Sequence, residues 1–397
     1  MLSTKEIIAK TENYGAHNYK PKEVVIVKGE DAVVTDPEGK KYFDMLSAYS
    51  ALNFGHCHPE IVKAAKDQLD KVTLTSRAFH NDILWKFCKE LARLTQKEMV
   101  LPMNTGAEAV ETSLKTARRW GAFKKGVEEG RQEIICCSNN FHGRTISIIT
   151  MSTDATARKG FGPFTSGFKV VEYGNADALE KAITPNTVAF LVEPIQGEAG
   201  IIVPKDGYLR KVREICTKHN ILFIADEVQT GFARTGKMFA CQHEDIAPDI
   251  YVLGKALGGG IMPVSAISAN KDILDVFTPG SHGSTFGGNP LACAVALKAM
   301  EILQRDNYPE MAAEKGKYLT DKLKEIKNSK IIDIRGKGLL IGVEFCQDAA
   351  PYVAKLIENG VLARETHERT IRFAPPINIS YEELDKAIAI LQRVLTE

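Results

Sequence analysis

Two polar side chains follow two apolar runs in the middle of the chain, and together they could do chemistry. Asp226 comes directly after the run 221–225, and Lys255 follows the run 251–254. Parallel sheets bind their ligands at the carboxyl ends of their strands. We therefore expect a carboxylate and an amine at the same edge of one sheet.

The surroundings of Lys255 favour a reactive amine over a solvated one. Gly254 precedes it and the segment 256–260, Ala-Leu-Gly-Gly-Gly, follows it, so the amine meets little water and a large ligand has room beside the backbone. A desolvated lysine has a lowered pKa and forms a Schiff base with an aldehyde. A carboxylate such as that of Asp226 would keep a pyridine nitrogen protonated. The pair indicates pyridoxal 5'-phosphate as the cofactor.

The phosphate of such a cofactor needs an anion site, and the start of one predicted helix fits. Thr105, Gly106 and Ala107 open a helical pattern, and helix amino termini bind anions through free N–H groups and the helix dipole. Thr-Gly before a helix is also a common cap with no ligand. The segment 280–289 offers a second, weak donor in Ser284 and Thr285.

A competing motif lies at 231–237, where Gly-Phe-Ala-Arg-Thr-Gly-Lys has the spacing of a nucleotide-binding P-loop. Met238 stands where that motif needs Ser or Thr to hold magnesium, and the preceding strand ends well before the loop, at Ala225. A nucleotide-binding protein is therefore disfavoured, and it remains the alternative from a different functional class. Lys237 is interpreted as a surface lysine.

Histidines and cysteines point to neither a metal nor a disulfide framework. His56 and His58 resemble a metal pair, but Gly55 and Pro59 predict a turn into a helix and no third ligand is indicated. The eight cysteines include no Cys-x-x-Cys pair. We expect no metal and a reducing, cytoplasmic environment.

Alternating elements must position these residues. From about 58 to 270, apolar runs alternate with helical stretches, which predicts a parallel sheet covered by helices on both faces. The expected strands are 133–137, 188–192, 221–225, 250–253 and 264–268, and the helices include 107–120 and 208–219.

The two ends of the chain have different patterns. A helix capped by Ser3 and Glu6 should precede a small antiparallel meander. The meander's runs are 24–27, 32–35 and 42–44; helices follow at 290–303 and 311–326, β-like runs at 331–334 and 338–345, and a closing helix after 380. We predict an N-terminal segment (1–57), a large cofactor domain (58–285) and a C-terminal α+β domain (286–397).

The composition limits the partners. The 397 residues carry 51 Lys and Arg against 50 Asp and Glu, a net charge of +1, which disfavours nucleic acid and membrane surfaces as partners. A hydrophobic fraction of 44% and a charged fraction of 25% are typical of a soluble globular protein. The stretch 256–269 is too short and too rich in glycine to span a bilayer, and the first residues resemble neither a secretory signal nor a transit peptide.

At this point the chain is identified as resembling a known family. The segments 222–236, 248–250 and 253–260 together resemble the signature of class III pyridoxal-phosphate aminotransferases, and the likeness extends from residue 14 to residue 376. The resemblance implies a fold-type I α/β architecture, with a large, mostly parallel sheet covered by helices and a smaller α+β domain built from both chain ends. It also implies a homodimer with shared active sites.

The resemblance assigns roles at the cofactor. Lys255 would be the Schiff-base lysine and Asp226 the partner of the pyridine nitrogen. Gln229 would contact the ring hydroxyl, Phe141 would stack on the ring, and Thr285 would reach the phosphate of the other subunit. The implied cofactor residues are Lys255, Asp226, Gln229, Val228, Phe141, Gly106, Ala107, Thr105 and Thr285.

Within the family, the segments 15–19 and 46–53 are similar to the branch that moves the δ-amino group of ornithine to 2-oxoglutarate. That reaction yields glutamate and glutamate 5-semialdehyde, which cyclises to pyrroline-5-carboxylate. By analogy, Tyr19 would bind the substrate α-amino group and Arg144 its α-carboxylate, while Tyr49 would shape the same pocket. Relatives that act on N-acetylornithine or 4-aminobutyrate, and a non-catalytic relative, remain alternatives.

One site must accept two substrates that carry their carboxylates differently. A forked arginine binds a carboxylate at two points, and the resemblance implies Arg372 for the oxo acid. Glu198 would neutralise Arg372 while ornithine is bound; a permanent salt bridge between the two is the alternative. His142 departs from the tryptophan that many ornithine enzymes have after the ring-stacking phenylalanine.

Overall fold

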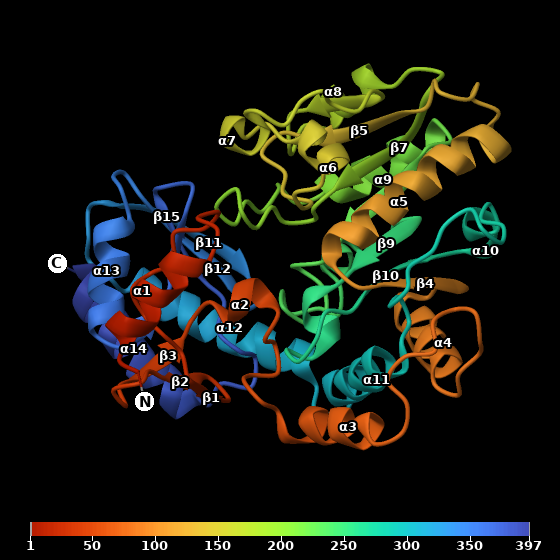
Figure 1. The fold of residues 1–397 in the computed structure, drawn as a ribbon. Coiled ribbons are helices and arrows are strands. Elements are labelled where there is room, and N and C mark those ends of the chain that lie inside the picture. The colour runs from red at the N-terminus through yellow and green to blue at the C-terminus, as the bar shows by residue number, and fades with distance from the viewer. Residues whose placement is uncertain (1, 397) are drawn as a thin grey trace.

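A computed structural model of the protein describes residues 2–396, and three sheets organise this range (Figure 1). Within it the central sheet has seven strands in the order β4-β10-β9-β8-β7-β5-β6. They are β4 (Met99–Met103), β5 (Glu133–Cys137), β6 (Phe168–Val171), β7 (Thr187–Val192), β8 (Leu222–Asp226), β9 (Ile250–Leu253) and β10 (Ser265–Ala269). Strands β5 to β9 pair in parallel, and β10 is antiparallel to both of its neighbours. The predicted α/β class with a mostly parallel sheet is confirmed.

Burial on both faces explains the continuous apolar runs. In β8, Leu222 and Ile224 pack on the same side as residues of α5 (Gly106–Trp120), whereas Phe223 and Ala225 pack with residues of α9 (Tyr208–Lys218). Figure 1 shows these two helices beside the sheet. Successive side chains of a strand point to opposite faces, so a strand covered on both sides needs no polar positions.

Two sequence predictions about strands were wrong, and two strands were not predicted. The run 264–268 was expected to be parallel, yet β10 is antiparallel. Strands β4 and β6 were not predicted; both lie at a sheet edge, β4 contains Pro102, which disfavours a strand, and β6 has only four residues, of which Val170 is 42% exposed. The run 24–27 is not a strand, since the chain pairs instead at β1 (Lys28–Glu30).

The two chain ends lie side by side, as the red and blue elements of Figure 1 show. Strand β13 (Val361–Leu362) pairs in parallel with β3 (Lys41–Asp44), next to β2 (Val33–Thr35) and β1. A third sheet has the order β11 (Ile331–Lys337), β12 (Leu340–Phe345), β15 (Thr370–Phe373) and β14 (Arg364–Thr366). The division into domains at residues 57 and 285 stays a prediction.

The remaining helices include α1, whose predicted capping box of Ser3 and Glu6 is confirmed. They are α1 (Thr4–Tyr14), α2 (Ser47–Ser50), α3 (Pro59–Leu69), α4 (Leu84–Thr95), α6 (Ile146–Met151), α7 (Ala155–Arg158), α8 (Ala176–Ala182), α10 (Lys271–Leu274), α11 (Pro290–Arg305), α12 (Tyr308–Lys324), α13 (Ala350–Glu358) and α14 (Tyr381–Thr396). Within residues 2–396, no helix combines the length and the apolar character that a membrane span requires.

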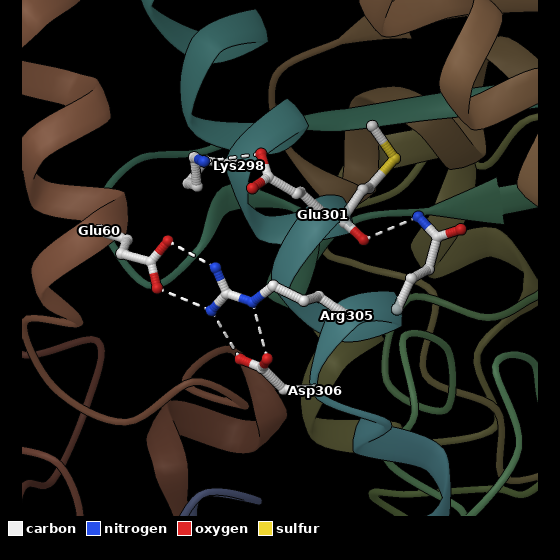
Figure 2. Close-up of polar contacts among 7 residues, drawn as sticks. Glu60, Lys298, Glu301, Arg305 and Asp306 are labelled. Atoms are coloured by element: carbon white, nitrogen blue, oxygen red, sulfur yellow. Dashed lines mark hydrogen bonds and ion pairs between the residues drawn. The ribbon is translucent and has the colours of Figure 1, made fainter.

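Helices α3 and α11 support the loop that follows Lys255. Gly259 has a φ of +60°, and a Cβ on it would lie 2.8 Å from Ile61 of α3. Arg305, the last residue of α11, forms a two-point ion pair with Glu60 of α3, with nitrogen–oxygen distances of 2.7 and 2.8 Å (Figure 2). Exposed pairs of this kind contribute at most about 1 kcal/mol, so apolar packing holds the two helices together.

Candidate active site

Asp226 and Lys255 line one cavity of about 190 Å³. Asp226 is the last residue of β8, and Lys255 follows the neighbouring parallel strand β9, so both side chains emerge at one sheet edge. The cavity is lined by Gly106, Ala107, Phe141, His142, Gly143, Glu193, Ile195, Asp226, Val228, Gln229 and Lys255. The expected meeting of the amine and the carboxylate is confirmed.

The Lys255 amine is poised as a nucleophile. Burial in the cavity lowers the pKa of Lys255 to about 8, and the positive charge of Arg372 acts in the same direction. The backbone at Lys255 has a φ of +44°, a strained value for a residue with a side chain. The lowered pKa increases the share of the neutral amine, which is the form that attacks an aldehyde.

The Asp226 carboxylate is fixed by two hydrogen bonds. Its Oδ1 accepts the Val228 N–H at 3.1 Å, and its Oδ2 lies 2.6 Å from His142 Nδ1. Burial opposes the charged imidazole, but the hydrogen bond to Asp226 and the charges of Asp226 and Glu193 raise the pKa of His142 overall. The Asp226 carboxylate is therefore buried and fixed in orientation where it lines the cavity.

A second buried carboxylate, Glu193, follows β7 at the same edge of the sheet. Burial raises its pKa to about 7. Its side chain accepts the N–H of Phe141 at 3.0 Å and the N–H of Gly197 at 3.4 Å. Glu193 thereby holds the loop that carries the aromatic ring of Phe141 into the cavity wall.

The start of α5 has the features expected of an anion site. Thr105 caps the helix, its hydroxyl accepting the Glu108 N–H at 3.2 Å, so the side chain is engaged in the cap. The N–H groups of Gly106 and Ala107 have no acceptor among residues 2–396. A Cβ on Gly106 would lie 3.1 Å from Val228 Cγ1, so a glycine lets the helix come this close to the β8 loop without moving that side chain.

These groups fit pyridoxal phosphate. The cavity brings together an amine of lowered pKa, a fixed carboxylate, an aromatic ring and a helix amino terminus with free N–H groups, which correspond to the aldehyde, the pyridine nitrogen, the ring face and the phosphate of that cofactor. Among the described residues no group of three or more His, Cys, Asp and Glu side chains could hold a metal ion.

A larger cleft of about 630 Å³ opens beside this cavity and shares Phe141, His142 and Gly143 with it. Its other lining residues include Arg144 and Glu198. Arg144 is exposed, with its guanidinium carbon 5.5 Å from the centre of the Phe141 ring. A carboxylate of a small molecule in the cleft could reach this arginine.

Arg372 of β15 lies deeper, and the structure brings it together with its predicted partner. One of its terminal nitrogens, Nη1, lies 2.9 Å from Glu198 Oε1 and 2.8 Å from Gln229 Oε1. The other, Nη2, donates to Ser50 Oγ at 2.8 Å, and its guanidinium carbon is 5.6 Å from the centre of the Tyr49 ring. Burial lowers the pKa of Arg372, which the negative charge of Glu198 opposes.

Seven predicted site residues do not line the cavity: Tyr19, Tyr49, Thr105, Arg144, Glu198, Thr285 and Arg372. Tyr19 is 65% exposed, and Thr285 is exposed; neither is among the described residues that line the cavity. The loop that carries Thr285 does lie beside the start of α5, because Asn104 Nδ2 donates to Ser284 Oγ at 2.9 Å. Thr285 therefore faces outward near the anion site.

Three residues that line the cavity or contact a predicted site residue were not predicted from the sequence. Glu193 ends an apolar run as Asp226 does, so the strand-end rule could have found it. His142 was noted only as a departure from the family, and its contact with Asp226 has no local signal. Ser50 reaches Arg372 across 322 positions of the sequence, which no spacing rule predicts.

The glycine-rich segment 231–237 is not a phosphate loop. Arg234 within it is fully buried and donates to the backbone carbonyls of Leu339 at 3.0 Å and Pro375 at 2.6 Å. Its remaining partner is the side chain of Asn53. The segment joins the large sheet to both chain ends, and this structural role accounts for its buried cation.

Comparisons with known proteins match the whole chain. A family model described as Aminotransferase class-III covers residues 14–395. An ornithine aminotransferase of Exiguobacterium sp. strain AT1b is 58% identical over 395 residues, covering 100% of this chain and 98% of that protein.

Solved structures agree with this match. The crystal structure of the ornithine aminotransferase from Toxoplasma gondii ME49 has a TM-score of 0.98 and 42% identity, covering 100% of this chain and 95% of that chain. The acetylornithine aminotransferase from Elizabethkingia anophelis has a TM-score of 0.91 and 45% identity, covering 100% of this chain and 99% of that chain.

Proposed function

Since the chain belongs to the class III aminotransferase family, we propose that it is an ornithine δ-aminotransferase dependent on pyridoxal phosphate. It would transfer the δ-amino group of L-ornithine to 2-oxoglutarate, giving glutamate 5-semialdehyde, which cyclises to pyrroline-5-carboxylate, and L-glutamate. The observation that carries the proposal is the ion pair of Arg372 Nη1 with Glu198 Oε1 at 2.9 Å. It lies beside a cleft that a second arginine, Arg144, also lines.

The residues that line the cavity would have different roles around the cofactor. When bound, pyridoxal phosphate supplies an aldehyde that takes up the amino group and a ring that withdraws electrons. Asp226 would hold the proton on the pyridine nitrogen, and Gln229, next to Val228, would contact the ring hydroxyl. Lys255, with its pKa of about 8, is the base that can take a proton from the carbon bearing the transferred amino group.

Arg144 and Arg372 would bind the carboxylates of the two substrates. Ornithine would place its α-carboxylate at Arg144 and its α-amino group at Tyr19, with Tyr49 shaping the pocket between them. Its chain would then reach Lys255 with the δ-amino group, while Glu198 neutralises Arg372. For 2-oxoglutarate, Glu198 would release Arg372 to the α-carboxylate, which a guanidinium binds at two points.

The test is an absorbance spectrum of the purified protein before and after ornithine. Ornithine should remove the visible band of the bound cofactor, 2-oxoglutarate should restore it, and pyrroline-5-carboxylate should accumulate. A protein without visible absorbance that binds ATP tightly would reject the proposal in favour of a nucleotide-binding protein.

A second candidate is an N-acetylornithine aminotransferase, although the 58% identity to the Exiguobacterium ornithine aminotransferase is higher than that to the Elizabethkingia acetylornithine enzyme. The Elizabethkingia acetylornithine enzyme is 45% identical, slightly more than the Toxoplasma ornithine enzyme at 42%. Rates with ornithine, N-acetylornithine and 4-aminobutyrate at equal concentration separate these activities. Slow turnover of ornithine beside fast turnover of the acetylated substrate would reverse the preference.

The active enzyme would be a homodimer with shared sites. Thr285 is exposed next to Phe286, whose side chain is 54% exposed, and both lie near the start of α5. In a dimer, Thr285 would reach the phosphate in the partner subunit's cavity. Light scattering should give the mass of two chains, and Thr285→Ala should weaken cofactor binding without separating the subunits.

We place the enzyme in the cytoplasm. Of the described residues, the eight cysteines are all free, and Cys57 and Cys346 are exposed, as a reducing compartment allows. Fractionation of cells that make the protein, followed by immunoblotting, tests the location.

A further inference from the structure

The segment Ser47–Ser50 adopts a left-handed turn without any glycine. All four residues have positive φ, 51° at Ser47, 47° at Ala48, 60° at Tyr49 and 70° at Ser50. This region is unfavourable for every residue with a side chain, and it persists only where surrounding contacts over-determine the backbone. A turn so strained points to side chains whose placement matters.

Contacts from two directions hold the turn. The Asp44 carboxylate, which is bonded to His56 Nε2 at 2.8 Å, accepts two backbone N–H groups at the start of the turn, at 2.9 and 2.8 Å. The Met45 carbonyl accepts the N–H of Ala374 at 2.7 Å. Because Ala374 directly follows β15, the turn is joined to the strand that carries Arg372.

The turn places the Ser50 hydroxyl against Arg372. Ser50 is 1% exposed and Arg372 2% exposed, and the distance from Nη2 to Oγ is 2.8 Å. A buried cation needs hydrogen-bond acceptors, and Arg372 Nε has none among the described residues. Each acceptor that the guanidinium does have therefore affects where it lies.

The two ends of the guanidinium have unlike partners. Nη1 has the Glu198 carboxylate, whose side chain is 29% exposed to the cleft, and the Gln229 carbonyl oxygen as acceptors. Nη2 has the neutral Ser50 hydroxyl, which the strained turn holds in place. When Glu198 gives way to a substrate carboxylate, Ser50 still holds Nη2. The hydroxyl hydrogen of Ser50 has no acceptor within residues 2–396, so it is free to donate to the same carboxylate.

We propose that Ser50 positions Arg372 for the α-carboxylate of the oxo acid and so sets the affinity for 2-oxoglutarate, while the ornithine half-reaction does not depend on it. This inference rests on the proposed function, in which Arg372 binds the oxo acid. A merely structural serine would affect both half-reactions alike.

The test is Ser50→Ala in the holoenzyme, with Ser47→Ala as the matched control. Ser47 lies in the same turn and is fully buried, but its Oγ has no hydrogen-bond partner among the described residues. Ser50→Ala should raise the KM for 2-oxoglutarate about tenfold, as expected for a lost hydrogen bond to a charged group. The single-turnover rate with ornithine should stay within about twofold, and Ser47→Ala should change neither value.

A second variant separates folding from the contact. Ser50→Gly removes the hydroxyl and also relieves the positive φ, so it should melt no lower than the wild type and still lose affinity for 2-oxoglutarate. Calorimetric titration of 2-oxoglutarate into the holoenzyme, with no amino donor present, measures that affinity directly.

Two results would overturn the inference: unchanged 2-oxoglutarate affinity in a folded Ser50→Gly protein, or equal losses in both half-reactions. Failure of the wild type to use ornithine would instead refute the proposed donor. The 2-oxoglutarate titrations would still report on Ser50 in that case.

Discussion

His142 Nδ1 lies 2.6 Å from Asp226 Oδ2, and neither side chain is more than 5% exposed. His142 is also the residue at which the sequence departs from many ornithine enzymes. The side chain of His142 bonds through Nδ1 to Asp226, the carboxylate that we expect to face the cofactor. The substitution at position 142 therefore changes a direct partner of Asp226. Its Nε2 has no partner among the described residues.

His142→Leu should weaken cofactor binding, because it leaves the buried Asp226 carboxylate with the Val228 N–H as its one remaining donor among the described residues. We expect the dissociation constant of pyridoxal phosphate from the apoenzyme to rise about tenfold, the effect of one lost hydrogen bond to a charge. Fluorescence titration measures it. His142→Asn, which can still donate, should recover part of the affinity; equal affinity in all three proteins would contradict the assigned role.

Lys255→Ala should fold normally yet lose the visible cofactor band, with turnover lower by several powers of ten, since the nucleophile and the proton carrier are one group. Lys237→Ala is the control, because Lys237 is exposed and lies in the rejected phosphate-loop motif. Steady-state rates and spectra of the two variants suffice. Near-normal activity of Lys255→Ala would refute the assignment.

The pKa of about 8 predicts how the apoenzyme recombines with pyridoxal phosphate. Below pH 8 the Lys255 amine is mostly protonated and cannot add to the aldehyde; above pH 8 it is mostly neutral. The recombination rate should therefore rise with pH and level off above about 8. Stopped-flow absorbance gives the profile, and a rise that continues past pH 10 would indicate an unperturbed lysine.

Glu198→Ala should leave Arg372 without its anionic partner, so glutamate gains as an amino donor relative to ornithine. The lost pair is nearly buried on the arginine side, and a shift of about tenfold in the ratio of kcat/KM values is expected. Glu368→Ala is a suitable control, since Glu368 lines the same cleft. An unchanged ratio in Glu198→Ala would mean a permanent salt bridge with no gating role.

Ala48→Gly should stabilise the protein. Ala48 is exposed with a φ of 47°, a conformation that costs a residue with a side chain roughly 1–2 kcal/mol. Glycine removes that strain but adds about 0.4–1 kcal/mol of unfolded-state entropy, leaving a net gain of about 0.5–1 kcal/mol in the free energy of unfolding. Urea denaturation measures it, and a lower midpoint would show that the turn is not strained.

Much of the fold could be predicted because local runs of apolar residues indicate the buried strands. The runs that became β5, β7, β8 and β9 are almost entirely apolar, with Glu133 at the start of β5 as the exception, since their strands are covered on both faces. The edge strands β4 and β6 were not predicted, because Pro102 in β4 disfavours a strand and the four-residue β6 is too short to give a clear pattern. The direction of β10 is set by its neighbours and not by its own residues.

The placement of Asp226 and Lys255 followed from the chain alone, because a strand-end residue inherits its position from the sheet edge. The surroundings of Arg372 did not. Glu198 and Ser50 lie 174 and 322 positions away from it, and they meet it only once both chain ends have packed against the large sheet. These hydrogen bonds join segments that are far apart in the sequence, and each needs its two atoms placed to within a fraction of an ångström. The periodicity of apolar residues carries no information about the distance between two such atoms.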